Sequence, residues 1–581
     1  MTRTSDSVPL TGISRRTFCK GAAVLGIWGG LASFGLAGCA PHSRAEELAD
    51  SAPWKAGTYT TEVTGHNAPY TMTVTFSDDA ITAIDTSANQ ESLGVGADAL
   101  KALQQQAIDN QTINIDAVTG ATLSSRSLQT GLEDCAKQAQ AFEVLSEAPV
   151  PEKPAVEEVY DADVCVVGGG GSGLAAAIAA VQAGASVIVL EKCGITGGST
   201  NVSEGALNAV DPERQEPQGI EDSIPTFHET TMKGGHNTNN PELVHFLTDN
   251  ALDSVHWLES LGVEFKDEIG SATGSLGQRS HYPATPSGNT YIRSFQQFID
   301  DNADAIMLLN DMQAKELILD DAGAVVGVKA LYDGEQEVTV NCGAVVIATG
   351  GFGGNVEYRQ KVNTGVWKEV VLDDSIGCTN IKPCAQGEGM VLAENAGAEL
   401  ICLSDIQLHP CGTPGTGLME DIRTSGRNRI FVNTDGKRFV NEGAERDVLC
   451  KNIFAQPDGT YWIVVNTLRY PNPDEPDANG ATINNMLALG HIVAGDTVEA
   501  LAGEMGVDAA NLQASIDAYN AVVEGGTDEF GFVAFETVSN QYLGGDAALA
   551  CSPETQARID RKVTEMVDTQ YQKAMDLLKT N

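Results

Sequence analysis

A glycine-rich segment between two apolar runs has the composition and spacing of a dinucleotide-binding turn. The run from Asp163 to Val167 leads straight into Gly-Gly-Gly-Gly-Ser-Gly, a helical stretch follows, and a second apolar run, Val187 to Leu190, is closed by an acidic residue. Glycines let a pyrophosphate approach the helix N-terminus closely, and the acidic residue can accept hydrogen bonds from ribose hydroxyls. A purely structural glycine turn is the weaker alternative, because such a turn does not require the full succession of strand, turn, helix, strand and acidic residue. The predicted cofactor contacts are Gly168, Gly170, Ser172, Gly173 and Glu191.

The same turn would also suit NAD, and the choice of FAD rests on two later segments. Gly197-Gly198-Ser199-Thr200 follows the second strand, and the apolar run from Ala344 ends in Gly350-Gly351-Phe352. These strings resemble the flavoprotein subunit family of fumarate reductase and succinate dehydrogenase, more closely its soluble flavocytochrome c type, over about residues 161–530. The resemblance implies FAD in a Rossmann-like domain. It also implies further FAD contacts at Ser199, Thr200, Gly205, Gly350 and Gly351.

An earlier segment, Asp116-Ala117-Val118-Thr119-Gly120-Ala121-Thr122, carries a second kind of chemistry. It resembles the flavinylation motif of FMN-binding domains, where the threonine after Gly-Ala is joined to FMN through a phosphoester, and this implies attachment at Thr122 by a flavin transferase. Ser124, Ser125 and a helix start just beyond are expected to donate hydrogen bonds to the phosphate. A plain Ser/Thr helix cap is the alternative. We predict a small antiparallel sheet within residues 57–85 and helices near residues 97–107 and 127–141 around the motif.

The family resemblance also implies a substrate site on a mobile clamp domain. Ile406-Gln407-Leu408-His409-Pro410 resembles the segment whose histidine holds a substrate carboxylate, and Arg446 matches the arginine that family members use as general acid. Reducing a C=C bond needs a hydride from reduced FAD on one carbon and a proton on the other. Because the ordinary pKa of arginine is too high for easy release, Glu420 is expected to replace the proton, with Arg423 in the same relay. Taken singly, each of these residues could be a surface arginine in an ion pair or a histidine in the core. Only their combined order along the chain favours a substrate site.

Beyond Phe530 the chain departs from the family pattern. The stretch expected to carry a second substrate histidine is absent, and Tyr542 stands where fumarate reductases place a carboxylate-binding arginine. Glu536 and Ala547 resemble remnants of a late FAD-contacting segment and are predicted to touch the cofactor. Three explanations stay open: a different substrate read by an aromatic side chain, a protein that has lost catalysis, or a deletion or altered reading frame in this sequence.

The N-terminal segment has the pattern of an export signal. Arg15-Arg16 precedes an uncharged run that ends in Leu36-Ala37-Gly38-Cys39, and this resembles a twin-arginine signal followed by a bacterial lipoprotein cleavage box. A transmembrane helix is the alternative, but a run of 18 residues with six glycines is near the lower limit for spanning. We expect removal of the signal, lipidation of Cys39, and a mature lipoprotein anchored by its lipid on the outer face of the cell membrane.

The net charge and the positions of the cysteines exclude some classes of partner and cofactor. The 581 residues include 35 Lys and Arg against 79 Asp and Glu, for a net charge of −44, which makes nucleic acid an unsuitable partner. The 12 cysteines form no CxxC pair, haem motif or Cys/His metal spacing, so neither haem nor structural zinc is supported and no metal is expected. Electrons are therefore expected to move through flavins.

Together these features predict an α/β fold, with a Rossmann-like FAD-binding domain that contains an inserted α+β clamp domain and follows a small α+β FMN-binding domain. The predicted bounds are 1–38 for the signal, 51–145 for the FMN-binding domain, 146–160 for a linker, 161–404 for the FAD-binding domain, 405–525 for the clamp, and 526–581 for an incomplete return to the FAD domain plus a C-terminal helix. The predicted function is reduction of a C=C bond in a conjugated, enoate-like small-molecule acceptor during anaerobic electron disposal. Electrons would pass from a membrane donor to covalent FMN, then to FAD and substrate. The alternative is a flavin-bearing electron-transfer or binding lipoprotein without substrate turnover.

Overall fold

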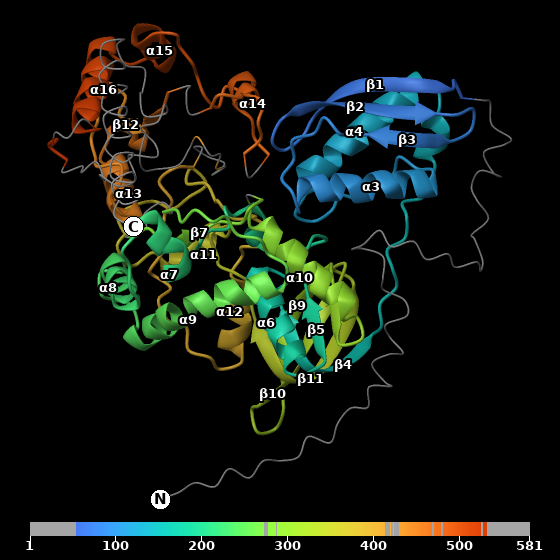
Figure 1. Ribbon diagram of the computed structural model, residues 1–581. Helices are drawn as coiled ribbons and strands as arrows, with labels where there is room; N and C mark the ends of the chain where they lie inside the picture. Colours follow the sequence, from blue (N-terminus) through green and yellow to red (C-terminus); the bar gives the residue numbers. More distant parts are fainter. Residues whose placement is uncertain are drawn as a thin grey trace, which may run out of the picture.

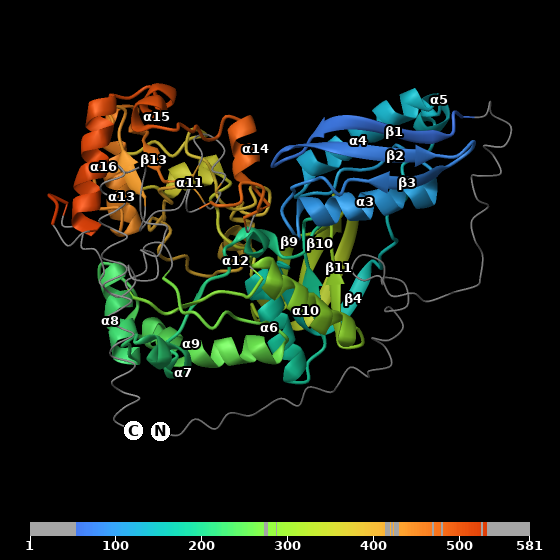
Figure 2. The same cartoon turned by 45° about the horizontal axis from the view of Figure 1, so that its top comes forward.

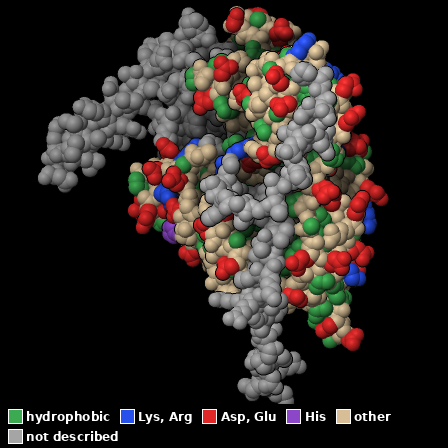
Figure 3. Space-filling model, turned by 90° about the vertical axis from the view of Figure 1, so that its right-hand side faces the viewer, with side chains coloured by type: hydrophobic (Ala, Val, Ile, Leu, Met, Phe, Trp, Pro, Cys, Tyr) green, Lys and Arg blue, Asp and Glu red, His purple; other side chains and the backbone are tan. Residues whose placement is uncertain are grey.

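The structure is a computed structural model that describes residues 54–271, 277–285, 287–412, 419, 422, 429–466, 470–477, 480–523 and 527–530. It is a mixed α/β protein, as predicted, and its elements form three groups that Figures 1 and 2 show from two directions. On the face shown in Figure 3, acidic side chains are scattered over the surface and basic side chains are few. Within the described ranges, no helix combines the length and the apolar character needed to cross a bilayer.

The N-terminal group is a three-stranded antiparallel sheet covered on one face by helices (Figure 1). Its elements are β1 (Gly57–Thr64), β2 (Pro69–Phe76), β3 (Ile81–Asp85), α3 (Gly96–Asn110), α4 (Thr122–Gln138) and α5 (Phe142–Ser146). Alternation along β2 buries every second side chain, with Met72 and Val74 fully enclosed. Leu100 on α3 and Leu128 on α4 pack against them in one core. The predicted sheet and helices are confirmed, except that α4 begins at Thr122, about one turn before the predicted start.

The central group is a six-stranded sheet in the order β8-β5-β4-β11-β10-β9. Its strands are β4 (Val159–Val167), β5 (Val187–Leu190), β8 (Ile306–Leu309), β9 (Met312–Leu319), β10 (Val325–Tyr332) and β11 (Gln336–Ile347). The first four in the sheet order run parallel, whereas β10 and β9 join as an antiparallel edge. Buried on both faces, β5 is wholly apolar, which is typical of a parallel sheet.

Helices and short strands surround this sheet. They are α6 (Gly171–Gln182), η1 (Gly198–Val202), β6 (Leu207–Asn208), α7 (Pro212–Gln215), η2 (Glu216–Gln218), α8 (Ile224–Gly234), α9 (Pro241–Ser260), β7 (Ser280–His281), α10 (Asn289–Asp301), α11 (Val356–Val362) and α12 (Glu388–Asn395). The apolar faces of α6 and α10 share one core with β4, β5 and β8. A second core lies on the opposite side, among β4, β5 and the antiparallel edge.

The segment before β4 lies along this sheet. Tyr332 on β10 donates a hydrogen bond to the carbonyl of Pro154 at 2.8 Å, and Gln336 donates to the carbonyl of Val156 at 3.1 Å. Lys153 pairs with Asp333 at 2.5 Å and with Asp311 at 3.3 Å. The proline-rich composition predicts an extended linker, and these contacts hold that extended chain against β10, the start of β11 and the turn between them.

The third group is a small α+β unit. It contains β12 (Ile430–Val432), α13 (Arg446–Phe454), η4 (Pro457–Gly459), β13 (Trp462–Val464), α14 (Ile483–Ala488), α15 (Val498–Met505) and α16 (Ala509–Val523). The strands β12 and β13 pair antiparallel and pack against α15 and α16. A buried ion pair joins Arg438 to Glu442, with N···O distances of 2.6 and 2.8 Å, and Glu442 also accepts the backbone N–H of Phe431. Because the charges are paired and hydrogen-bonded, this contact fixes the loop that leads from β12 to α13.

Candidate active site

The carboxyl ends of three parallel strands meet at the glycine-rich turn. Val167 of β4 is in register with Leu190 of β5 and Ile347 of β11, so the residues that follow each strand lie at one edge of the sheet. The N–H of Gly168 donates to the carbonyl of Leu190 at 2.8 Å, and the N–H of Ala348 donates to the carbonyl of Val167 at 2.8 Å. In open α/β sheets, cofactors bind at this carboxyl edge.

The shape of the turn fits a nucleotide cofactor. Gly168 has a φ of +112°, and a side chain there would also meet the carbonyl of Ala348. A Cβ on Gly173 would run into the backbone of Gly168, so only glycine allows the first turn of α6 to pack this closely against the strand. By contrast, added Cβ atoms at Gly350 and Gly351 would meet nothing within 4 Å. The turn is therefore tight where helix meets strand, and the space is open where a cofactor would lie.

Glu191 closes β5 and is buried in this edge. Its carboxylate accepts the backbone N–H groups of Gly169 and Cys193, each at 2.8 Å. Burial raises the pKa of Glu191, while those two hydrogen bonds act in the opposite direction. Each carboxylate oxygen has a second lone pair, so the side chain is held in place and can still accept ribose hydroxyls.

The remaining predicted FAD contacts lie around the same turn. Ser172 is exposed in the first turn of α6, and the neighbouring Gly170 precedes that helix. Thr200 accepts the N–H of Gly171 at 3.2 Å, and Ser199 accepts the N–H of Ile381 at 3.1 Å. The carbonyl of Gly205 accepts a hydrogen bond from the Tyr291 hydroxyl. The structure thus brings these residues together around one turn, and their contacts to FAD stay predictions.

Thr122 is exposed and is the first residue of α4. The preceding loop is closed by a hydrogen bond from the N–H of Ala121 to the carbonyl of Val118 at 2.9 Å, and Gly120 has a φ of +101°. A helix N-terminus offers unpaired N–H groups and the positive end of the helix dipole, both of which favour a phosphate. An accessible hydroxyl at this place can be esterified without disturbing the core.

The expected role of Ser124 and Ser125 as phosphate donors is wrong. Both are buried: Ser124 donates to the carboxylate of Glu91, and Ser125 donates to the carbonyl of Ala121 at 2.9 Å. Glu91 itself accepts the N–H of His66 at 2.7 Å. The two serines therefore fix the start of α4 from inside, because α4 begins at Thr122 and turns them toward the core.

The loop of the FMN motif contacts the loop that follows β5. The N–H of Gly194 donates to the carbonyl of Thr119 at 3.2 Å, and a Cβ on Gly120 would meet Ile195 at 2.8 Å. A second contact joins Asn201 to the carbonyl of Gly94 at 3.1 Å. The loop that contains Thr119 and Gly120 and the loop that follows Glu191 are thus direct neighbours across the domain boundary.

His409 and Arg446 are brought together, as the family resemblance implies. Burial and, as a second cause, the nearby charge of Arg446 together lower the pKa of His409 to about 4. The backbone N–H of Cys411 donates to Nδ1 of His409 at 3.2 Å, so the ring is neutral and carries its hydrogen on Nε2. Such a ring can donate one hydrogen bond to a carboxylate.

Arg446 is the first residue of α13, and its guanidinium donates to Oε1 of Gln407 at 3.2 Å. Its Nε is buried with no acceptor among the described residues, and none of their carboxylates lies within ion-pair distance of it. Gln407 belongs to the Ile406–Pro410 segment, and its residue type gave no signal of this role. Trp367, which donates to the carbonyl of Ile406 at 2.8 Å, holds the same segment, and no local motif singled it out.

Several predicted residues lie outside the part of the chain that the structure describes. They are Glu420, Arg423, Glu536, Tyr542, Ala547 and Cys39. The proton relay, the late FAD contacts and the lipidation site therefore stay predictions.

The neutral state of His409 predicts how stability depends on pH. In the unfolded chain this residue binds a proton near pH 6.5, whereas in the folded protein it does so only near pH 4. Between these values the unfolded chain binds more protons, so His409 is expected to lower the free energy of unfolding by about 1 to 3 kcal/mol as the pH falls from 7 to 4. Above pH 7 the contribution is constant.

Thermal unfolding of wild type and His409→Gln at pH 7 and pH 5 measures this effect. Glutamine does not titrate, so the wild type is expected to lose more of its midpoint temperature on acidification than the variant. His256→Gln, at an exposed position on α9, is the matched control and should follow the wild type. Parallel shifts in all three proteins would show that His409 is not buried as a neutral ring.

Comparison with known proteins agrees with this geometry. The family described as FAD binding domain matches residues 163–543, and the FMN-binding domain family matches residues 65–137. Urocanate reductase of Eggerthella lenta is 34% identical over 89% of this chain and 85% of its own length. NADH:acrylate oxidoreductase of Vibrio harveyi is 33% identical over 85% of this chain, which spans only 55% of that longer protein.

A solved structure shares the fold. The open conformation of a flavocytochrome c3 fumarate reductase aligns with a TM-score of 0.50 and 29% identity, covering 64% of each chain. Urocanate, acrylate and fumarate each contain a C=C bond conjugated to a carboxylate. This chain therefore belongs to the FAD binding domain family of fumarate reductase-like flavoproteins, and it carries an FMN-binding domain ahead of that fold.

Proposed function

We propose that this protein reduces the C=C bond of a small acceptor in which that bond is conjugated to a carboxylate. The observation that carries the proposal is the pairing of neutral His409 with Arg446, whose Nε has no acceptor among the described residues. A neutral donor beside a guanidinium is suited to an anionic substrate, because the ring can donate a hydrogen bond to a carboxylate oxygen and the positive charge favours an anion nearby. The relatives named above act on acceptors of this class.

The residues of the chain divide the work. FAD held at the glycine-rich turn and Glu191 would supply the hydride for one alkene carbon. His409 orients the carboxylate through Nε2–H, and Arg446 delivers a proton to the other carbon from the N-terminus of α13. Gln407, which accepts a hydrogen bond from Arg446, keeps the guanidinium in place. Glu420, with Arg423, would return the proton to Arg446 between turnovers.

The second flavin and the cellular setting belong to the same proposal. FMN would be attached to Thr122 by a flavin transferase, and electrons would pass from a membrane donor through FMN and FAD to the substrate. The direct contact between the Thr119–Gly120 loop and the loop after Glu191 supports this order. Export through the twin-arginine signal and lipidation of Cys39 would hold the protein on the outer face of the membrane, close to such a donor.

A viologen assay tests the activity. Purified protein with both flavins is mixed anaerobically with reduced viologen and with fumarate, acrylate, urocanate and larger aryl enoates, and the corresponding saturated acids serve as controls. Oxidation of viologen by at least one enoate and by none of the saturated acids is the expected result. A protein that carries both flavins and turns over no enoate would contradict the proposal and leave an electron-transfer or binding lipoprotein.

The proposed FAD contact of Glu191 leads to a prediction about affinity. Glu191→Ala removes the acceptor for the ribose and frees the N–H groups of Gly169 and Cys193. Loss of charge-assisted hydrogen bonds of this kind is expected to weaken FAD binding about 10- to 100-fold. Equilibrium dialysis of the apoprotein against FAD measures it, with Glu213→Ala, at an exposed acidic position on α7, as control. Equal affinity in the two variants would remove Glu191 from the site.

A further inference from the structure

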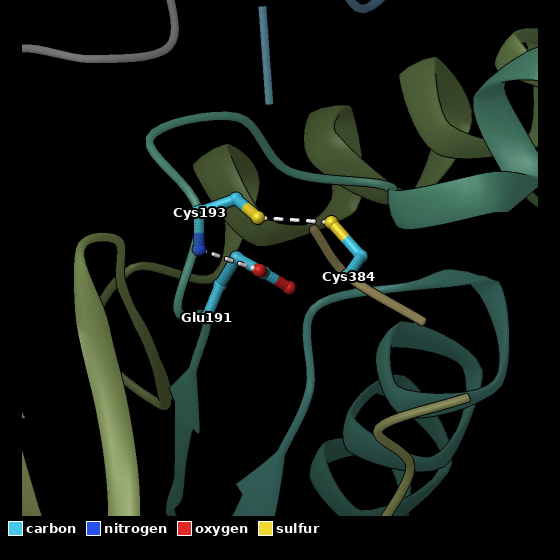
Figure 4. A group of neighbouring side chains, drawn as sticks. All are labelled: Glu191, Cys193 and Cys384. Carbon is cyan, nitrogen blue, oxygen red and sulfur yellow. Dashed lines mark hydrogen bonds between the residues drawn. The ribbon is translucent and has the colours of Figure 1, made fainter. Parts of the chain in front are cut away.

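Two cysteines that are far apart in the sequence face each other beside Glu191. The Sγ atoms of Cys193 and Cys384 are 2.9 Å apart, and Figure 4 shows the two side chains pointing toward one another. Cys193 is fully buried three residues beyond the end of β5, whereas Cys384 is partly exposed in the loop before α12. Neither cysteine takes part in the proposed reduction.

Neighbouring contacts hold the two segments against each other. Lys192 forms an ion pair with Glu388, and the N–H of Ile381 donates to Ser199 at 3.1 Å. These contacts lie on either side of the cysteine pair along both segments. The thiols therefore face each other because two backbone segments are fixed around them, and forming a bond between them requires only a small movement of the side chains.

A metal ion suits this group less well. The ligand atoms of Glu191, Cys193 and Cys384 lie within 4.8 Å of one another, which is the separation of a metal cluster. Two thiolates bound to one tetrahedral metal at about 2.3 Å would, however, stand ~3.8 Å apart. The observed 2.9 Å is closer than that, and the Glu191 carboxylate already accepts two backbone N–H groups. The geometry favours a sulfur–sulfur bond.

We propose that Cys193 and Cys384 are a modification site, at which the two thiols form a reversible disulfide with each other. The oxidant is itself a disulfide, carried by a small molecule or a protein. The thiolate of Cys384, the accessible partner, attacks the oxidant and forms a mixed disulfide with release of one thiol. Cys193 then attacks the sulfur of Cys384 and gives its proton to the adjacent Glu191 carboxylate, which passes it to the departing thiolate, so that the second thiol is released and the carboxylate is restored. Two protein thiols and one external disulfide thus become one protein disulfide and two external thiols.

The disulfide would link covalently the two segments that flank the proposed FAD site. Glu191 and the Ser199–Thr200 segment lie on one side of the pair, and residues 381–388 lie on the other. Release of FAD requires local opening of these segments, and a covalent tie between them disfavours the open state. We expect the oxidised protein to release FAD about tenfold more slowly than the reduced protein, a factor that corresponds to ~1.4 kcal/mol. This consequence rests on the FAD contacts proposed above, whereas bond formation does not.

Peptide mapping of the holoprotein tests the bond. The protein is incubated with oxidised or reduced glutathione, free thiols are blocked with N-ethylmaleimide, and peptides are analysed by mass spectrometry without reduction. A Cys193–Cys384 cross-linked peptide is expected only after oxidation, and it should vanish in Cys384→Ser but persist in Cys402→Ser, which removes an exposed thiol elsewhere. Two alkylated thiols after oxidation, or a lasting glutathione adduct on Cys384, would overturn the proposal. So would protection of both thiols by stoichiometric zinc ion.

The rate of FAD release tests the consequence. Recovery of free FAD fluorescence after dilution is followed in the oxidised protein and again after reduction with dithiothreitol. Slow release that reverts on reduction, and that is absent in Cys384→Ser, is expected. Equal rates in a protein that carries the cross-linked peptide would overturn the tie to the cofactor. Because neither readout involves an enoate, a failure here is distinguishable from a failure of the viologen assay.

Discussion

Thr122→Ala is expected to abolish covalent FMN while leaving FAD in place. Thr122 presents its hydroxyl in the first turn of α4, where the helix N-terminus stabilises a phosphate. The residues that fix this turn, Ser124 and Ser125, are buried and satisfied within the protein. Removing one exposed hydroxyl is therefore expected to leave the fold intact and to take away the group that the motif assigns to esterification.

Acid precipitation of protein made together with a flavin transferase measures the result. The wild type should retain FMN in the pellet and release FAD, and the variant should release both flavins or lack FMN altogether. Thr130→Ala, an exposed threonine two turns further along α4, is the matched control and should retain FMN. Covalent FMN in the Thr122→Ala protein, or free FMN in the wild type, would refute attachment at this residue.

The nucleotide-binding unit was predictable because its signals are local. The glycine turn, the apolar run of β5 and the acidic residue after it follow one another in the chain, and β5 has the predicted bounds, Val187–Leu190. Strand, turn and helix form one continuous unit, so its residue types report the geometry directly. The bounds of whole domains depend on packing between distant segments, and they remain predictions.

The flavinylation loop shows where local reasoning fails. The string around Thr122 predicts an attachment residue, but the role that it suggests for Ser124 is wrong, because Ser124 donates a hydrogen bond to Glu91, 33 residues earlier in the chain. That buried carboxylate accounts for the direction of Ser124, and no residue of the motif indicates its presence. The contact between Cys193 and Cys384 was even less predictable from local sequence, because the two positions are 191 apart and no known cysteine spacing connects them.

The proximity of His409 and Arg446 was predictable only from their order along the chain. His409 and Arg446 carry no local signature of catalysis, and the resemblance alone places them in one site. The structure adds the physical content, namely a neutral ring with its hydrogen on Nε2 and a guanidinium that Gln407 orients. It describes neither Glu420 nor Arg423, so the fate of the proton between turnovers rests on the family pattern.

Arg446→Ala is expected to lower kcat for the enoate by about 100- to 10,000-fold, the usual contribution of a positioned acid. The guanidinium stands at the first residue of α13 near His409, and the substitution removes the group that is proposed to protonate the alkene carbon. Arg446→Lys keeps the positive charge but loses the planar fork that also bonds to Gln407. It should recover only part of the rate.

Steady-state kinetics with reduced viologen separate catalysis from binding. Loss of a group that acts in the transition state lowers kcat, whereas loss of a substrate-binding charge raises KM and leaves kcat unchanged. Lys451→Ala, one turn further along α13 in an exposed ion pair with Asp447, is the matched control, because such pairs contribute little. All three variants must carry FAD and FMN in the wild-type ratio. An Arg446→Ala protein that changes KM alone would make Arg446 a carboxylate-binding residue and move the search for the acid elsewhere on the clamp.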